Sequence, residues 1–149
     1  MTYKKKILLV CSPYYKDITD NLIIGASDLL KSKAIDYEIL NVPGALEIAP
    51  AIKLISDKSQ NKQLFDGFVA LGCIIRGETY HFEIVANESS RALTYLSINY
   101  SIPIGNGILT VSNKDQAITR SDPNLLNKGA GAVKACLSLI DIRNSIRYE

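Results

Sequence analysis

The sequence is poor in the residues that mark disulfide-rich, metal-binding and nucleic-acid-binding proteins. It has no tryptophan, one histidine, three cysteines and a net charge of only +2 over 149 residues. Cys11, Cys73 and Cys136 lie far apart in apolar runs, which excludes a closely spaced zinc or redox motif and predicts buried thiols in a reducing compartment. The small charge and the scattered basic residues give no reason to expect nucleic acid as a ligand.

Long apolar runs are also missing, so no segment of the sequence is a candidate for a membrane span. The apolar run at residues 7–11 follows three lysines, but it is too short for a signal peptide and no small-residue cleavage site follows it. We therefore expect a cytoplasmic protein without membrane contact. The absence of linkers, repeats and low-complexity stretches predicts a single domain over residues 1–149.

The hydrophobic period alternates along the chain between that of a buried strand and that of an amphipathic helix. This alternation predicts an α/β fold, a three-layer α/β/α sandwich around a four-stranded parallel sheet with flavodoxin-like winding. Strands are predicted at residues 6–11, 35–42, 68–75 and 102–109. Helices are predicted around residues 22–30, 48–55, 82–96, 115–120 and 133–140.

Ligands of such folds bind beyond the carboxyl ends of the strands. Tyr14, Gly44, residues 76–81 and Asn106 are all expected just beyond those ends. Because these positions follow different strands of one parallel sheet, we expect them to surround a common crevice.

The only histidine, His81, stands at the predicted start of a helix, after the turn Arg76-Gly77-Glu78-Thr79. Backbone amides and the positive end of the helix dipole favour an anion there. The same field disfavours imidazolium, which keeps the ring neutral as a general base requires. A histidine or threonine in this place is also a common helix cap or surface residue, and the pattern leaves both interpretations open.

Three further segments are candidates for ligand contact. Residues 43–47 form either a simple strand-to-helix turn or a flat seat on which Glu47 binds hydroxyl groups. Tyr14 stands over the expected crevice and can stack on a flat heterocycle. Arg120 and Lys128 either only offset the carbonyl dipoles near helix ends or form part of an anion site. Lys128 stands at the predicted start of a helix, where a positive charge opposes the helix dipole. A residue in such an unfavourable place is a candidate for function.

Five motifs in order resemble the 6,7-dimethyl-8-ribityllumazine synthase family of riboflavin biosynthesis, from the first strand to the last helix. They are Val42-Pro43-Gly44-Ala45-x-Glu47, Ala70-Leu71-Gly72-Cys73-x-Ile75-Arg76-Gly77-Glu78-Thr79-x-His81-Phe82, Asn87-Glu88, Gly107-Ile108-Leu109-Thr110 and Asn127-Lys128-Gly129-Ala130. The resemblance implies a transferase that joins 5-amino-6-(D-ribitylamino)uracil to 3,4-dihydroxy-2-butanone 4-phosphate. It also implies that phosphate and water are released and that no metal or organic cofactor is used.

The resemblance assigns a role to each candidate residue. His81 matches the proton-transfer histidine, and Arg120 matches the arginine that binds the phosphate of the butanone substrate. Lys128 lies near the same substrate, and Tyr14 takes the place of an aromatic residue that stacks on the pyrimidine. The remaining substrate-binding positions that the resemblance implies are Ala45, Leu46, Glu47, Cys73, Ile74, Ile75, Gly77, Glu78, Thr79 and Asn106.

The resemblance also implies a homo-oligomer. In members of this family the site lies between two subunits, with residues 108–109, Arg120 and Lys128 contributed across the interface. Family members form pentamers, which in some species close into a shell, and riboflavin synthase is a possible partner. Shell-forming members often carry a glycine-rich pattern in the loop between Arg120 and Lys128. Here this loop contains Pro123, which fixes a different turn, so we expect free pentamers.

The chain departs from the family pattern at three places, which keeps other functions open. Pro13 precedes Tyr14 where an arginine is common, Asn106 replaces a frequent phenylalanine, and Gly131 replaces an acidic neighbour of Lys128. A flavin- or lumazine-binding carrier is therefore the main alternative. An archaeal-type riboflavin synthase is disfavoured by the phosphate-binding residues, and a response-regulator-like domain is disfavoured because no acidic cluster follows the first strand.

Overall fold

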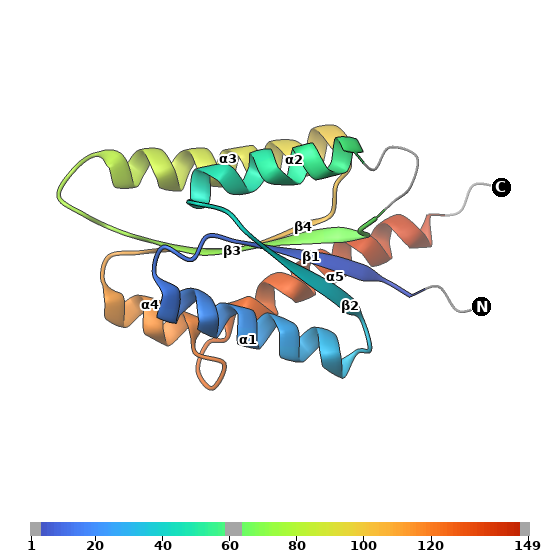
Figure 1. Ribbon diagram of the computed structural model, residues 1–149, viewed down its shortest axis with the longest axis horizontal. Coiled ribbons are helices and arrows are strands. Elements are labelled where there is room, and N and C mark those ends of the chain that lie inside the picture. The colour runs from blue at the N-terminus through green and yellow to red at the C-terminus, as the bar shows by residue number, and fades with distance from the viewer. Residues whose placement is uncertain (1–3, 59–63, 147–149) are drawn as a thin grey trace.

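Four parallel strands form the centre of the molecule, and helices cover both faces of their sheet (Figure 1). The structure is a computed structural model that describes residues 4–58 and 64–146. The strand order β2-β1-β3-β4 confirms the predicted α/β sandwich and agrees with flavodoxin-like winding. The elements are β1 (Lys6–Cys11), α1 (Lys16–Ser32), β2 (Asp36–Asn41), a short 3-10 turn η1 (Ala45–Glu47), α2 (Ile48–Lys58), β3 (Gly67–Ile75), α3 (His81–Tyr100), β4 (Ile104–Val111), α4 (Lys114–Ser121) and α5 (Lys128–Ser145).

The two central strands are apolar over their whole length because both of their faces are covered. In β1, Ile7 and Leu9 face the core under α1 and α5, whereas Leu8 and Val10 face the core under α2 and α3. β3 is buried from Gly67 to Ile74. Continuous apolar runs are expected for parallel strands between two helix layers, which is why the sequence pattern located both strands correctly.

The fourth strand lies two residues further along the chain than predicted. It begins at Ile104 because Pro103 has no amide hydrogen to donate to a ladder, and the Pro103 carbonyl accepts from Phe68 N at 2.9 Å instead. Asn106 is therefore the third residue of β4, opposite Ala70 of β3, and the prediction that it lies beyond the strand's carboxyl end is wrong. β4 is an edge strand, and Asn106 Oδ1 accepts from the amide of Ile108 at 2.9 Å.

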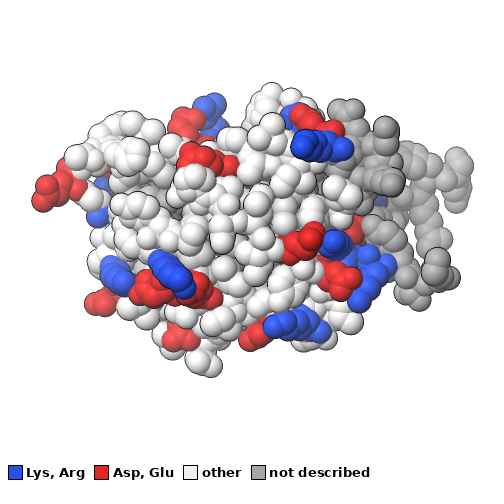
Figure 2. Space-filling model, viewed as in Figure 1, with Lys and Arg blue, Asp and Glu red and all other residues white. Residues whose placement is uncertain are grey.

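Acidic and basic side chains lie next to one another on the face shown in Figure 2, as expected for a mixed, solvated surface. Edge strand β2 is accompanied by two such pairs, Lys4–Asp36 and Lys6–Glu38, both with N–O distances of 3.1 Å. Charges along a strand edge discourage pairing with another chain. None of the helices in residues 4–58 and 64–146 combines the length and the apolar character that crossing a membrane requires.

Gly129 allows helix α5 to pack closely against helix α1. A methyl group on Gly129 would overlap the carbonyl oxygen of Leu22 in α1 and lie 2.9 Å from the Leu22 carbonyl carbon. Gly131, two residues further on, has nothing within 4 Å of the same position. The start of α5 is fixed by Asn127, whose Oδ1 accepts from Ala130 N at 3.4 Å. Lys128 therefore opens the helix, as predicted.

We expect Gly129→Ala to lower the free energy of unfolding by about 1–3 kcal/mol, because α1 and α5 must move apart to admit the methyl group. Gly131→Ala is the matched control in the same helix and should be neutral or stabilising by up to about 1 kcal/mol, because alanine has the higher helix propensity. Urea unfolding of the two variants and the parent chain measures both effects. Equal stability of the two variants would contradict the close approach.

All three cysteines are buried and unpaired, as predicted. Burial raises the pKa of the Cys11 and Cys136 thiols to about 12 and that of Cys73 to about 11. Because the reactive species is the thiolate, a raised pKa leaves these side chains protonated and inert at neutral pH.

Alkylation at pH 8 should therefore be at least about 100-fold slower for the native chain than for the chain in urea, where thiols have ordinary pKa values. Mass spectrometry of peptides labelled with iodoacetamide gives the rate at each cysteine. Cys73 should react first of the three, since its thiol faces a hollow. Native labelling of Cys11 at the unfolded rate would be incompatible with this burial.

Candidate functional site

A hollow of about 390 Å³ lies where the strand order reverses, at the carboxyl ends of β1, β2 and β3. The connections from β1 to β2 and from β3 to β4 leave two neighbouring strands in opposite directions, so the loops after β1 and β3 separate and leave a crevice. The hollow is lined by Ser12, Tyr14, Tyr15, Pro43, Gly44, Ala45, Leu46, Glu47, Cys73, Ile74, Ile75, Gly77, Thr79, His81, Phe82 and Val85.

His81 is the first residue of α3 and lines this hollow. Its amide donates to Thr79 Oγ1 at 3.4 Å, and its ring has no hydrogen-bond partner among the described residues. Both ring nitrogens are therefore available to a ligand. Within the described chain, the amides of Gly77, Glu78 and Thr79 donate to no backbone carbonyl. Free amides beside a helix N-terminus form a seat for an anion.

Two tyrosines stand at one side of the hollow. The rings of Tyr14 and Tyr15 meet edge to face, with centroids 5.0 Å apart and an interplanar angle of 76°. Tyr15 is partly buried against the core, and burial raises the pKa of its hydroxyl. Tyr14 is 76% exposed, so one face of its ring is open to a flat ligand.

The opposite side is formed by the turn that follows β2. Gly44 is extended, with φ −153° and ψ 175°, and its carbonyl accepts from Glu47 N at 3.1 Å. Glu47 is exposed at the mouth of the hollow, where its carboxylate can accept hydrogen bonds from hydroxyl groups. Between the two sides, Cys73, Ile74 and Ile75 provide an apolar wall from β3.

Arg120 and Lys128 lie in a second hollow, of about 420 Å³, between β4 and the start of α5. Arg120 Nη1 donates to the Gln116 carbonyl at 3.2 Å. Neither cation forms an ion pair with a described residue. Two unpaired cations beside a helix N-terminus favour an anionic ligand. Asn106 lies in this hollow, on the exposed edge of β4.

The predicted site residues thus divide into two groups within one chain. The first hollow holds Tyr14, Ala45, Leu46, Glu47, Cys73, Ile74, Ile75, Gly77, Thr79 and His81. The second holds Asn106, Arg120 and Lys128, whereas Glu78 lies exposed in the turn and lines neither hollow.

The prediction omits several residues that line the first hollow. Ser12 follows β1 directly and is buried, and Val85 lies one helical turn after His81. Helical spacing from His81 would have indicated Val85. Ser12 carries no sequence signal beyond its place at the end of a strand.

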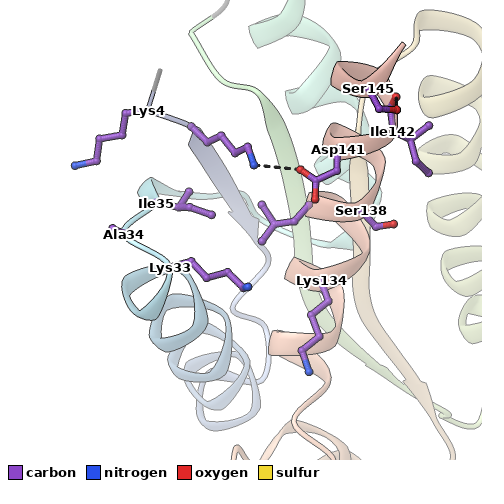
Figure 3. A pocket seen from close by; sticks show the side chains of 11 residues that line it. Lys4, Lys33, Ala34, Ile35, Lys134, Ser138, Asp141, Ile142 and Ser145 are labelled. Atoms are coloured by element: carbon purple, nitrogen blue, oxygen red, sulfur yellow. Dashed lines mark hydrogen bonds and ion pairs between the residues drawn. The ribbon is translucent and has the colours of Figure 1, made fainter. Parts of the chain in front are cut away.

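A larger hollow, of about 1050 Å³, lies between the end of α1, the start of β1 and α5 (Figure 3). Four lysines line it, of which Lys4 pairs with Asp36 and Lys5 with Asp141, each at 3.1 Å. It contains no histidine and no predicted site residue, so size does not identify the functional site here. No group of three or more His, Cys, Asp or Glu side chains suited to a metal ion occurs in the described part of the chain.

Comparison with known proteins gives a consistent result. The family model for 6,7-dimethyl-8-ribityllumazine synthase matches residues 4–144. The synthase of Agrobacterium fabrum is 46% identical over 144 residues, covering 96% of this chain and 97% of the relative. That of Zymomonas mobilis is 45% identical, covering 95% and 98%. That of Bartonella henselae is 49% identical, covering 94% and 89%. The chain therefore belongs to the 6,7-dimethyl-8-ribityllumazine synthase family, a family of enzymes of riboflavin biosynthesis.

Proposed function

We propose that the chain condenses 5-amino-6-(D-ribitylamino)uracil with 3,4-dihydroxy-2-butanone 4-phosphate to 6,7-dimethyl-8-ribityllumazine and releases phosphate and water. The observation that carries the proposal is the composition of the first hollow. A flat aromatic face, an apolar wall, a carboxylate at the mouth and an unpaired imidazole surround one space of about 390 Å³. These groups suit a planar heterocycle that bears hydroxyl groups and that reacts by proton transfer.

The pyrimidine stacks on Tyr14, and Glu47 accepts hydrogen bonds from the ribityl hydroxyls. The 5-amino group of the pyrimidine attacks the ketone and one water is lost to form an imine. The imine then loses a proton as phosphate leaves, and the resulting enol tautomerises to a ketone. The ribitylamino nitrogen attacks this second carbonyl, and a second water is lost as the ring closes. Protons move at each of these steps, and His81 can accept or donate them because neither ring nitrogen is engaged with a described residue. The apolar wall and the ring stack hold the two substrates together, which lowers the entropic barrier to their reaction.

The butanone phosphate needs contacts that one copy of the chain does not gather. His81 and the free amides of residues 77–79 lie in one hollow, and Arg120 with Lys128 lies in the other. We therefore infer that the second hollow of one subunit faces the first hollow of its neighbour. Helix α3 supports this arrangement, because it exposes the apolar side chains of Ile84, Tyr95 and Ile98 on one face, which a neighbouring subunit can cover.

A repeated contact between unlike surfaces generates a ring when the rotation between neighbouring subunits closes. The ring proposed here is a free pentamer. Residues 121–126, where shell-forming relatives frequently carry a glycine-rich loop, include Pro123 and hold a tight turn in which Leu125 N donates to the Asp122 carbonyl at 3.0 Å.

The first test is turnover. Lumazine formation from the two substrates is followed optically with the purified chain and in a control without enzyme. We expect acceleration, and we expect Arg120→Ala to raise the KM for the butanone phosphate roughly 10- to 100-fold, the loss of one charge-assisted contact. Lys134→Ala, which removes an exposed cation from α5, is the control and should be silent. A rate equal to the no-enzyme control, with ribityl ligands still bound, would assign the chain to the carrier class instead.

The second test addresses the shared site. His81→Ala should lower kcat by roughly 100-fold without abolishing turnover, because positioning persists when proton transfer is lost. When His81→Ala and Arg120→Ala chains are denatured, mixed and reassembled, about a quarter of the interfaces should regain both residues. Activity of the mixture should then exceed that of either parent. A mixture whose activity is the mean of its parents would place both residues in the same subunit's site, and sedimentation would establish the ring's size.

A further inference from the structure

The turn between β3 and α3 has few bonds of its own, although it carries His81. The last backbone hydrogen bond before the turn is that of the Arg76 amide, directly after β3, which donates to the Val111 carbonyl at 2.9 Å. The next such bonds are those of the Tyr80 carbonyl, which accepts from Glu83 N at 3.1 Å and from Ile84 N at 3.4 Å. Between them, Gly77 has open space around the position of a Cβ atom. Residues 77–79 are all exposed, and the one hydrogen bond that holds them within the described part of the chain is the 3.4 Å contact in which the Thr79 hydroxyl accepts from the His81 amide.

One side chain spans this turn. The Arg76 Nη1 donates to Glu83 Oε1 at 2.7 Å, which joins the end of β3 to the first turn of α3. The same guanidinium lies over the ring of Phe82, with its central carbon 4.5 Å from the ring centroid. Phe82 in turn lines the hollow that contains His81. Arg76 itself does not line that hollow, so its effect on a ligand must pass through its neighbours.

We propose that Arg76 is a positioning residue, whose clamp on Glu83 and Phe82 holds the free amides of residues 77–79 and the His81 ring in one arrangement. The inference rests on the proposed function for its effect on turnover. The butanone phosphate depends on this turn, whereas the pyrimidine depends on Tyr14 and the turn at residues 45–47. Loss of the clamp should therefore weaken use of one substrate and not of the other.

Arginine suits this role better than lysine. Its planar guanidinium donates in the plane while its face stacks on an aromatic ring, whereas an ammonium has no flat face. Arg76→Lys should thus keep the ion pair with Glu83 and lose the stacking on Phe82. The pair is partly exposed, with 53% of the Arg76 side chain and 32% of the Glu83 side chain accessible, so the clamp is expected to modulate the site and not to determine folding.

Steady-state kinetics with both substrates tests the proposal on the assembled full-length chain. Arg76→Ala should lower kcat/KM for the butanone phosphate by about tenfold, the size expected for a partly exposed ion pair with a ring contact. The KM for the pyrimidine should change less than about twofold, because its contacts lie elsewhere. Glu83→Gln should lower the same kcat/KM by a smaller factor, and Arg76→Lys should retain part of the rate that Arg76→Ala loses. The double variant Arg76→Ala with Glu83→Gln should have a kcat/KM no lower than that of Arg76→Ala alone.

Lys53→Ala is the matched control. Lys53 also combines an ion pair with a ring contact on another part of the surface, although its ammonium does not stack: it pairs with Asp57 at 2.6 Å and lies 4.6 Å from the centroid of the Tyr100 ring. Its removal should leave the kinetic constants for both substrates unchanged. Sedimentation of every variant confirms that the assembly is the same.

Hydrogen–deuterium exchange of the segment around Glu83 and Ile84 provides a readout without turnover. Their amides, bonded to the Tyr80 carbonyl, should exchange several-fold faster in Arg76→Ala and Glu83→Gln than in the parent or in Lys53→Ala. A silent Glu83→Gln, with full rescue by Arg76→Lys, would overturn the proposal and make Arg76 a direct phosphate ligand. Unchanged exchange would overturn it even if the parent chain proved inactive. An inactive parent with faster exchange in both variants would reject the proposed function and retain the clamp.

Discussion

Strand β1 is hydrogen-bonded on both sides, to β2 and to β3, and the arrangement of the site depends on this pairing. The chain leaves β1 toward one edge of the sheet through α1, and it returns across β1 through α2 to form β3. The loops after β1 and β3 must therefore diverge, and the crevice between them cannot be filled by backbone. Tyr14, the turn before α3 and His81 meet there because of this reversal and not because they are close in the sequence.

The site combines rigid and weakly held parts. Its wall is formed by β3, whose residues lie in the sheet and are buried on both faces, so a flat ligand meets a fixed surface. The segment that precedes His81 is instead a turn with few internal hydrogen bonds, spanned by the ion pair of Arg76 and Glu83. Free amides can bind an anion only while they have no backbone partner, which explains why such a turn needs support from side chains.

The two hollows differ in the charged groups that line them. The first hollow contains an unpaired imidazole and a carboxylate, and the second contains two unpaired cations at the start of α5. Lys128 opposes the dipole of its own helix, a local cost that no described acidic side chain offsets. A phosphate supplied between two subunits would satisfy both cations, and the homo-oligomer proposed for this family member gives this unfavourable placement a physical reason.

The sequence by itself determined the layers and most of the residues that line the two hollows. Continuous apolar runs located β1 and β3, because strands covered on both faces admit few polar residues, and helical periodicity located the helices between them. The predicted position of β4 was wrong by two residues, because an apolar run does not show which of its residues join a ladder. Asn106 was expected beyond the carboxyl end of this strand, whereas it lies near the strand's start. Only the tertiary structure decided that, through Pro103, which leaves the pairing to begin at Ile104. The separation of Arg120 from His81 within one chain is compatible with what the family resemblance implied. Only the tertiary structure showed that Arg76 spans the turn to Glu83, since such a contact depends on packing and not on local pattern.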